Sequence, residues 1–293
     1  QGSCENRDLL PIFAAVQQSN SFSMYTKQML SVLLISLTTL VFLSCGKEDV
    51  SENAARLRIK LTDAATPVLK EIYLNMETIE VLPVDSAGIA GEWVLLDFTG
   101  GEYNLLKLMN GRTVQLVDQY FPAGGKIDKI RLSFGDNNRM VTITDQPIPL
   151  QKAPTITEYL LIHDVDASLA ANIITSIVID INAALSVRES NGSYLLDPRA
   201  RAFPETFGGS LKGYVLPPEA SPVVLITREG DSLITLPEGT DGMFLFTGLQ
   251  EGAWKIHLLA DPASLYRDTI FTDTIEQGRV REIRPRPIRL VQQ

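Results

Sequence analysis

The sequence predicts an all-β protein with two β-sandwich-like domains. From residue 54 onward, apolar and polar residues alternate over short runs, which is the pattern of half-buried strands. Gly, Pro, Asn and Asp separate these runs at short intervals, as turns would. No long amphipathic segment occurs, so an α/β enzyme scaffold is not expected. We place the two domains at residues 55–203 and 208–293.

The first domain is predicted as a series of strands. The alternating runs lie at residues 57–61, 72–76, 79–81, 92–98, 130–134, 140–144, 177–181 and 194–196. A change of phase at Glu77-Thr78 predicts a β-bulge. The turn-rich tetrad Gly135–Asn138 predicts a hairpin between the two runs beside it. Short helical turns are expected at Tyr103–Met109, ending at Asn110-Gly111, and at Ala167–Asn172.

The second domain is predicted to follow a hinge at Phe207–Gly209. Its runs lie at residues 211–216, 223–227, 232–236, 243–246, 253–259, 268–272 and 280–283. Pro217-Pro218, Glu229–Asp231 and Pro237–Gly239 supply turns between them. Several short strands with regularly spaced turns are typical of a β-sandwich.

The composition restricts the partners and cofactors that can be expected. The formal net charge is −9 and no stretch is dense in Lys and Arg, so binding to nucleic acid, which depends on neutralising phosphates, is not expected. The locally basic end of the chain is interpreted as the outward positions of a final strand. No cysteine follows Cys45, so the domains are expected to rely on core burial without disulfides. No cofactor is predicted, because two histidines and no further cysteine leave few zinc ligands.

An apolar segment precedes the domains. Lys27, the apolar run Met29–Leu43 and a small residue before Cys45 follow the order of a secretory signal peptide. The run is shorter than the roughly 20 residues of a comfortable bilayer span. Residues 24–44 resemble a bacterial lipoprotein signal peptide of the loose type found in Bacteroidetes, since Phe42–Ser44 departs from the usual Leu-small-Gly order. This resemblance implies that the Cys45 thiol is the site of lipid attachment.

Two other interpretations of this segment stay open: an ordinary signal peptide followed by a chance cysteine, and an uncleaved membrane anchor. The residues Lys47–Asp49 resemble a short signal that sends some Bacteroidetes lipoproteins to the outer leaflet of the outer membrane. The alternative is a plain polar tether over residues 45–54. We expect a lipid-anchored outer-membrane protein, with surface exposure left open. Residues 1–23 are left out of the fold prediction as a leader of unknown role.

Four segments of the first domain resemble the DUF4382 family, a domain of unassigned function common in envelope lipoproteins. They are LRIKLTDA (Leu57–Ala64), GEYNLLKLMNG (Gly101–Gly111), FPAGGKIDKIRLSFGDNN (Phe121–Asn138) and NGSYLLDPRARA (Asn191–Ala202). Where the family usually has a Lys-Leu-Asn-rich strand, this chain has Tyr159–Ile173. The matching motifs look structural: Asp63 can bond its own turn, and Asn104 is expected to cap the short helix.

Residues 208–293 resemble the carboxypeptidase-regulatory-like or prealbumin-like β-sandwich. The resemblance depends mainly on TDGMFLFTGL (Thr240–Leu249), in which Phe244 and Phe246 are expected to face the core. It implies a spacer or adhesion module. Pilin relatives of this sandwich form isopeptide bonds between Lys and Asn. No matching Asn in the final strand accompanies Lys212 or Lys255, so no such bond is expected.

The tetrad His163–Asp166 (HDVD) is the only cluster of ligand-type side chains in the sequence. If it is extended, Asp164 and Asp166 share one face and could bind calcium together with backbone carbonyls. The alternative, which we favour, is a solvated strand edge. The other histidine, His257, lies in an apolar strand and is interpreted as a rim residue. A Ser–His–Asp arrangement needs three converging groups, and only His163 and His257 are available as its histidine.

The expected function is a non-catalytic binding or scaffolding module that reaches the membrane through the lipid on Cys45 and binds an envelope protein or a glycan. Cys45 is the only site residue predicted. One alternative is glycan binding or adhesion through exposed aromatic side chains, although packing in or near the core is favoured for each. The candidates are Tyr73, Trp93, Tyr120 and Tyr194. The other alternative is a metal-assisted hydrolase that uses the acids near His163.

Overall fold

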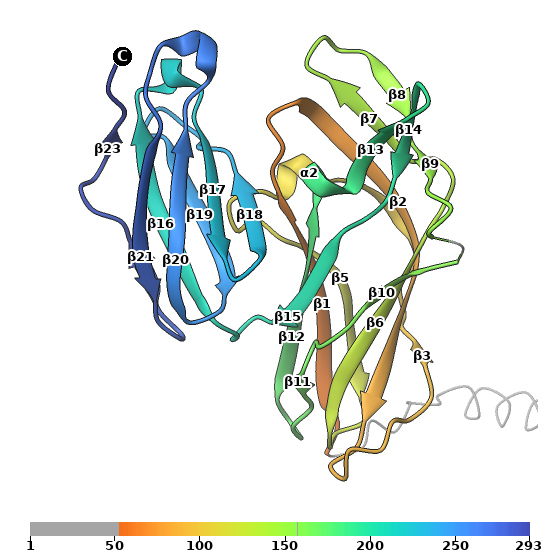
Figure 1. Ribbon diagram of the computed structural model, residues 1–293. Coiled ribbons are helices and arrows are strands. Elements are labelled where there is room, and N and C mark those ends of the chain that lie inside the picture. Colours follow the sequence, from red (N-terminus) through yellow and green to blue (C-terminus); the bar gives the residue numbers. More distant parts are fainter. Residues whose placement is uncertain (1–52, 157) are drawn as a thin grey trace, which may run out of the picture. The chain divides into compact units, whose positions relative to one another are not determined.

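The computed structural model describes residues 53–156 and 158–293, and their regular secondary structure is almost entirely β-strand (Figure 1). The predicted all-β class is therefore confirmed. The described residues belong to one compact unit. Cys45 and the predicted signal peptide lie outside the described residues. Within the described ranges, no helix combines the length and the apolar character that a bilayer crossing requires.

The first sheet has four strands in the order β15-β12-β1-β5. Their bounds are β1 (Ala55–Ala64), β5 (Val114–Phe121), β12 (Ile174–Asn182) and β15 (Ala200–Pro204). The strand β1 pairs in parallel with β12 and antiparallel with β5. Alternate side chains of β1, namely Leu57, Ile59 and Leu61, are fully buried, as the period-two pattern predicted.

The second sheet is built around the long strand β2 (Leu69–Val84) and follows the order β10-β6-β2-β7-β8. Its other strands are β3 (Val94–Leu95), β4 (Gly101–Asn104), β6 (Lys126–Phe134), β7 (Arg139–Thr142), β8 (Pro147–Pro149), β10 (Leu160–Ile162) and β11 (Ala167–Ser168). The pairing of β2 with β6 shifts register between Met76 and Thr78, so the predicted β-bulge is confirmed.

The predicted hairpin around Gly135–Asn138 is wrong. Met76 pairs with β6 and with β4, and Tyr73 pairs with β7 and with β4. Because β4 occupies one edge of β2 at both positions, β6 and β7 must follow each other along the opposite edge. The two strands therefore pair with β2 one after the other, and the tetrad forms a bulge between them without reversing the chain. Asn138 fixes this bulge from within, since its amide donates to Gly135 O at 2.6 Å and accepts from Asn75 N at 2.9 Å.

Two expectations for local structure also need correction. The 3₁₀ helix Leu105–Leu108 forms inside the predicted helical segment, but the Asn104 side chain does not cap it. Both polar atoms of that side chain are buried, and neither has a hydrogen-bond partner among the described residues. Ala167–Asn172 is not helical at its start, because β11 pairs there with β6 and only residues 171–172 form a turn. In both cases sheet pairing to distant residues decides the local conformation.

A small third sheet has the order β13-β14-β9. It consists of β9 (Gln151–Lys152), β13 (Val187–Ser190) and β14 (Ser193–Leu196), and the short helix α2 (Ala183–Ser186) leads directly into β13. Asn182 caps α2, since its side chain accepts from Leu185 N.

The remaining strands, between residues 209 and 289, form two sheets in the orders β19-β16-β22 and β18-β17-β20-β21, with β23 also paired to β16. Their bounds are β16 (Gly209–Leu216), β17 (Val223–Arg228), β18 (Asp231–Thr235), β19 (Met243–Leu249), β20 (Gly252–Leu259), β21 (Thr269–Ile275), β22 (Val280–Glu282) and β23 (Ile288–Arg289). Two 3₁₀ turns, Pro218–Ala220 and Pro262–Ser264, lie in the connections.

Buried apolar residues gather in two clusters. One draws only on residues 55–202, and the other only on residues 211–290. We call the parts of the chain around them the N-terminal β-region (residues 55–204) and the C-terminal β-region (residues 209–293). Phe244 is fully buried and Phe246 is 6% exposed in the second cluster, as the sequence predicted.

Candidate functional site

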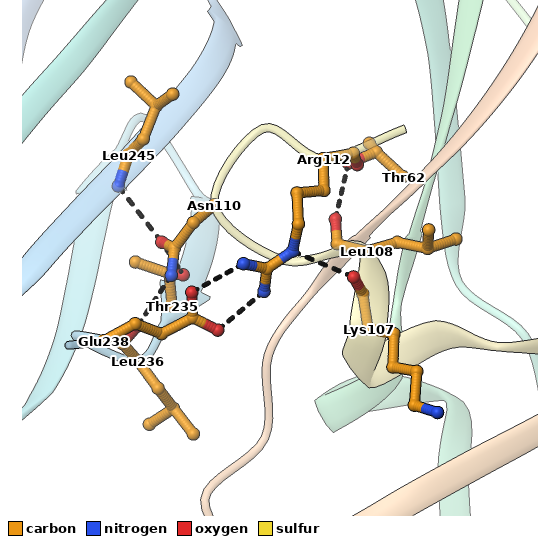
Figure 2. Close-up of polar contacts among 9 residues, drawn as sticks. All are labelled: Thr62, Lys107, Leu108, Asn110, Arg112, Thr235, Leu236, Glu238 and Leu245. Carbon is orange, nitrogen blue, oxygen red and sulfur yellow. Dashed lines mark hydrogen bonds and ion pairs between the residues drawn. The ribbon is translucent and has the colours of Figure 1, made fainter. Parts of the chain in front are cut away.

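The loop that follows the 3₁₀ helix Leu105–Leu108 reaches from the N-terminal β-region into the C-terminal one (Figure 2). Asn110 has a left-handed backbone, with φ 57°, and is 8% exposed. Its amide nitrogen donates to Leu236 O at 3.0 Å, and its amide oxygen accepts from Thr235 Oγ1 at 2.9 Å and from Leu245 N at 3.1 Å. One buried side chain therefore satisfies three polar groups of β18, β19 and the residue after β18.

An ion pair lies beside this contact. The guanidinium of Arg112 donates to both carboxylate oxygens of Glu238, at 2.7 and 2.6 Å, and its Nε donates to Lys107 O at 2.9 Å (Figure 2). The bidentate pairing lowers the pKa of Glu238 and raises the pKa of Arg112. Thr62 of β1 donates its hydroxyl to Leu108 O or Arg112 O, so the loop is attached to the N-terminal core as well.

Arg201 of β15 makes a second connection. It pairs with Asp180 of β12 through Nε at 2.9 Å, and it donates to the carbonyls of Gly248 at 2.7 Å and Thr247 at 3.1 Å. Gly248 has φ +61° and lies so close to Phe203 that an added Cβ would overlap the aromatic ring. The two regions therefore meet through matched polar groups and through close packing. We call the contacts of Asn110, Arg112 and Arg201 the junction.

The tetrad His163–Asp166 lies next to the junction, in the loop between β10 and β11. Asp164 and Asp166 both have positive φ, of 57° and 51°, so the expected extended conformation with two opposite faces is wrong. Val165 is buried and donates its N–H to Asp128 O at 3.0 Å, while the three polar side chains are exposed. Asp166 forms an ion pair with Lys126 at 2.7 Å and raises the pKa of that lysine.

This loop forms one wall of a groove of about 300 Å³. The N-terminal β-region contributes His163 and Asp164, and the C-terminal β-region contributes Asp231 and Gln250. Phe207, in the connection between the regions, is 43% exposed and also lines it. We call this cavity the junction groove, and it is the candidate functional site.

Two phenylalanines separate the junction groove from a neighbouring hollow. Phe203 and Phe207 lie with their ring centroids 6.3 Å apart and line both cavities, as Gly248 does. The neighbouring hollow has a volume of about 400 Å³ and includes hydroxyl side chains at Thr206 and Ser210. The exposed ring of Phe207 is thus flanked by open volume on two sides.

Some charged side chains that line the groove have an ion-pair partner, and others do not. Arg201 is engaged by Asp180 and the two carbonyls, and the Asp166 carboxylate is engaged by Lys126. The structure shows no ion pair for the two other lining carboxylates within the described ranges; these are Asp164 and Asp231. The groove is therefore rich in hydrogen-bond acceptors and carries surplus negative charge.

The geometry gives no support for a metal at the tetrad. No group of three or more His, Cys, Asp or Glu suited to a metal ion occurs in residues 53–156 and 158–293. Asp164 and Asp166 do not share a strand face, and one of them already binds Lys126. The hard-cation interpretation therefore lacks the converging oxygens that calcium requires.

The aromatic candidates lie apart from one another and from the groove. Tyr73 lies under the guanidinium of Arg139, at 4.0 Å, and Trp93 lies under that of Arg131, at 3.8 Å. Tyr194 is half-buried against the N-terminal core. Tyr120 is the exposed member of the set, at 57%. Three of the four are thus at least half-buried, as the sequence analysis favoured.

The remaining singled-out residues are peripheral to the groove. His257 is half-buried in β20, and its shielded Nε2 has no hydrogen-bond partner within the part of the chain that the structure describes. Lys212 lies 5.5 Å from the ring centre of Tyr214. In the basic C-terminal segment, Arg281 pairs with Asp273 at 2.9 Å and Arg286 lies 3.9 Å above Tyr214.

Sequence analysis missed the residues that join the two regions. Asn110-Gly111 was interpreted only as the end of a helical turn, Phe207 only as part of a hinge and Arg201 only as part of a family-like motif. No pattern pointed to Arg112. The partners of Asn110 and Arg112 lie more than 120 residues away in the chain. The one available signal was an Asn-Gly pair inside a motif that resembles a family, since Asn tolerates the left-handed conformation.

Comparisons with solved structures find weak likenesses. They include the TIE protein of Bacillus anthracis (9% identity, TM-score 0.23), the major pilin subunit BcpA of Bacillus cereus (8%, 0.22) and a mutant of the shaft pilin spaA of Lactobacillus rhamnosus GG (9%, 0.23). The alignments cover 81%, 82% and 82% of this chain and 34%, 71% and 97% of those chains, so this chain spans about a third of the first.

A search of curated proteins finds no match. Among family models, the one described as "Domain of unknown function (DUF4382)" matches residues 54–198. These residues include every strand from β1 to β14 and the loop that carries Asn110 and Arg112. The chain therefore contains a DUF4382 domain, as the sequence motifs indicated.

Proposed function

We propose that this protein is a non-catalytic binding or scaffolding module of the bacterial envelope, anchored by a lipid on Cys45. The observation that carries the proposal is the junction. Asn110, Arg112 and Arg201 connect the two β-regions through buried or bidentate contacts, so the walls of the junction groove are held at a fixed separation. A preformed groove loses less conformational entropy when it binds a partner.

The anchoring part of the proposal rests on the sequence. Residues 24–44 have the order of a lipoprotein signal, and Cys45 follows directly. Each methylene of an acyl chain that enters the bilayer contributes about 0.8 kcal/mol, so the two or three chains of a bacterial lipoprotein give stable attachment. We place the protein in the outer membrane. The C-terminal β-region, with its resemblance to a carboxypeptidase-regulatory-like sandwich, then serves as a spacer or adhesion unit.

Palmitate labelling combined with protease treatment of intact cells tests this proposal. The wild-type protein should incorporate labelled palmitate and fractionate with the outer membrane. Cys45→Ser should remove the label and release the protein from the membrane fraction. The matched control is Cys4→Ser, which changes the only other cysteine and should leave both results unchanged. A wild-type protein that carries no fatty acid, or label that survives in Cys45→Ser, would contradict the anchor.

The non-catalytic part needs a separate measurement, because the hydrolase alternative assigns a role to the acids near His163. We expect no hydrolysis of ester, phosphoester or glycoside substrates above the rate of a His163→Ala variant. We also expect the same thermal unfolding temperature with EDTA and with added calcium. A calcium-dependent rise in this temperature that disappears in Asp164→Asn would support the metal alternative.

A further inference from the structure

We propose that the junction groove binds a neutral, linear oligosaccharide. The inference depends on the proposed function, because it assigns a ligand to that binding module. Four properties of the groove support it: an exposed aromatic ring, acceptors with free lone pairs, a surplus of negative charge, and open volume on both sides of the ring.

The exposed ring supplies the apolar contact. Phe207 is 43% exposed although it touches Phe203, which is only 6% exposed. An aromatic side chain that remains accessible in a concave site offers a flat apolar face with a defined orientation. The axial C–H groups of a pyranose ring form a matching flat surface. A stacked sugar would remove the exposed part of Phe207 from water.

The polar rim matches the hydroxyl groups of a sugar. The exposed side chains of His163, Asp164, Asp231 and Gln250 line the groove around Phe207. A carboxylate accepts hydrogen bonds through two oxygens, and an amide both donates and accepts, so adjacent hydroxyls can be bound in both directions. Asp164 and Asp231 have no ion pair within the described residues, so their oxygens remain available for this purpose.

The charge of the groove selects against anionic ligands. Among the described residues that line the groove, Arg201 is the only arginine, and its guanidinium is bound to Asp180, Thr247 O and Gly248 O. Sulfated or uronic-acid glycans and nucleic acids would thus meet carboxylates without an available cation. A neutral saccharide meets no such repulsion. A lysine-rich peptide would also be attracted, and it is the competing ligand that the experiment must separate.

The volume on both sides of Phe207 favours a chain over a single sugar. The groove and the neighbouring hollow measure about 300 and 400 Å³ and share the two phenylalanines. A single hexose on Phe207 would leave one of them unfilled. A linear oligosaccharide can place one unit on the ring and extend its neighbours into both spaces.

Isothermal titration calorimetry on the full-length protein in detergent tests the inference. The probes are maltotetraose, laminaritetraose, xylotetraose and chitotetraose, with pentalysine as the competing ligand. At least one tetrasaccharide should bind, and Phe207→Ala should weaken this binding by about tenfold, the loss expected when one aromatic contact is removed. Asp164→Asn should weaken it by a smaller factor. The control is Tyr120→Ala, which removes a more exposed aromatic side chain outside the groove and should leave the affinity unchanged.

Three results would overturn the inference: no binding by any tetrasaccharide, binding that survives Phe207→Ala, or saturable binding of pentalysine alone. Circular dichroism of each variant shows whether a loss of binding reflects unfolding. Phe207→Leu, which keeps apolar volume without an aromatic face, should bind as weakly as Phe207→Ala if stacking is the cause. A protein that carries palmitate on Cys45 but binds no sugar would contradict this inference and leave the anchoring proposal unaffected.

Discussion

At the scale of single residues, the side chain of Asn110 does most to join the two β-regions. Its position requires a left-handed backbone, a hydrogen-bond donor and a double acceptor at the same time. Asparagine tolerates that conformation better than most residues and supplies all three groups. A carboxylate would lack the donor toward Leu236 O, and a smaller side chain would leave buried polar groups unsatisfied.

Replacement of Asn110 separates these contributions. Asn110→Ala should lower the free energy of unfolding by about 2–4 kcal/mol, because it removes three hydrogen bonds and adds backbone strain. Asn110→Gly removes the same hydrogen bonds without the strain and should cost less than the alanine variant. The control is Asn172→Ala, at an exposed residue with nearly the same φ of 58°, which should cost about 1 kcal/mol. Urea unfolding measures all three; equal losses for Asn110→Ala and Asn172→Ala would contradict the role given to the amide.

Glu238 makes the junction sensitive to acid. The hydrogen bonds from Arg112 lower the pKa of Glu238. The ion pair therefore stabilises the folded state fully at pH values above the ordinary glutamate pKa of about 4.3. This stabilisation is lost as the pH falls below that value and through the lowered pKa of the folded state. The partly exposed pair should contribute about 0.5–1 kcal/mol. Glu238→Gln should therefore be less stable than wild type at pH 7, and the difference should shrink at pH 3. Urea unfolding at both pH values checks this, with the exposed Glu219→Gln as control. An equal stability difference between wild type and Glu238→Gln at pH 7 and pH 3 would contradict this explanation.

At the scale of elements, sequence periodicity predicted individual strands well, but it did not predict their partners. The run Leu57–Leu61 alternates as a half-buried strand should, and β1 has that burial. The phase change at Glu77-Thr78 was visible because a bulge alters the side-chain period within one strand. Whether Gly135–Asn138 turns the chain back or continues it depends on β2, some 60 residues earlier. Short-range turn chemistry cannot distinguish these two outcomes.

The bulge at Gly135–Asn138 provides a direct test of that distinction. Asn138 is 2% exposed and bonds Gly135 O and Asn75 N, whereas the adjacent Asn137 is exposed. Asn138→Asp should destabilise the protein by about 3 kcal/mol at pH 7, because it removes a donor and buries a charge. Asn137→Asp should change stability by less than about 0.5 kcal/mol. Thermal and urea unfolding measure both. A simple exposed hairpin turn would tolerate the two substitutions equally.

The candidate site was predicted only in part. The tetrad His163–Asp166 was recognised because it places one of the two histidines beside two aspartates, and it does line the groove. Its expected extended shape was wrong because Asp164 and Asp166, between β10 and β11, both adopt left-handed φ values. Phe207 was interpreted as part of a hinge, since Gly208-Gly209 follows it. Its exposure depends on packing between regions, which no local pattern records.

At the scale of the whole molecule, the structure has two hydrophobic cores and one polar junction between them. Separate cores would unfold independently if the contacts between them were weak. Here the contacts combine a buried amide, a bidentate ion pair, an arginine bound to two carbonyls and the tight approach of Gly248 to Phe203. We expect this combination to make residues 53–293 unfold in one cooperative transition.

The two tryptophans allow this expectation to be measured without disturbing either core. Trp93 belongs to the N-terminal β-region and Trp254 to the C-terminal one, and the chain has no others. After labelling with 5-fluorotryptophan, each should give one fluorine resonance, assigned with Trp93→Phe. In wild type both resonances should shift to the unfolded position at the same urea concentration.

Gly248→Ala should push Phe203 away and cost about 1–3 kcal/mol by overpacking. We expect it to move the Trp254 transition to a lower urea concentration than the Trp93 transition. Gly192→Ala has a similar positive φ, with open space around the added methyl, so it should keep the two transitions together. Separate transitions in wild type would mean that the junction does not couple the cores, and a groove with fixed walls would then lose its physical basis.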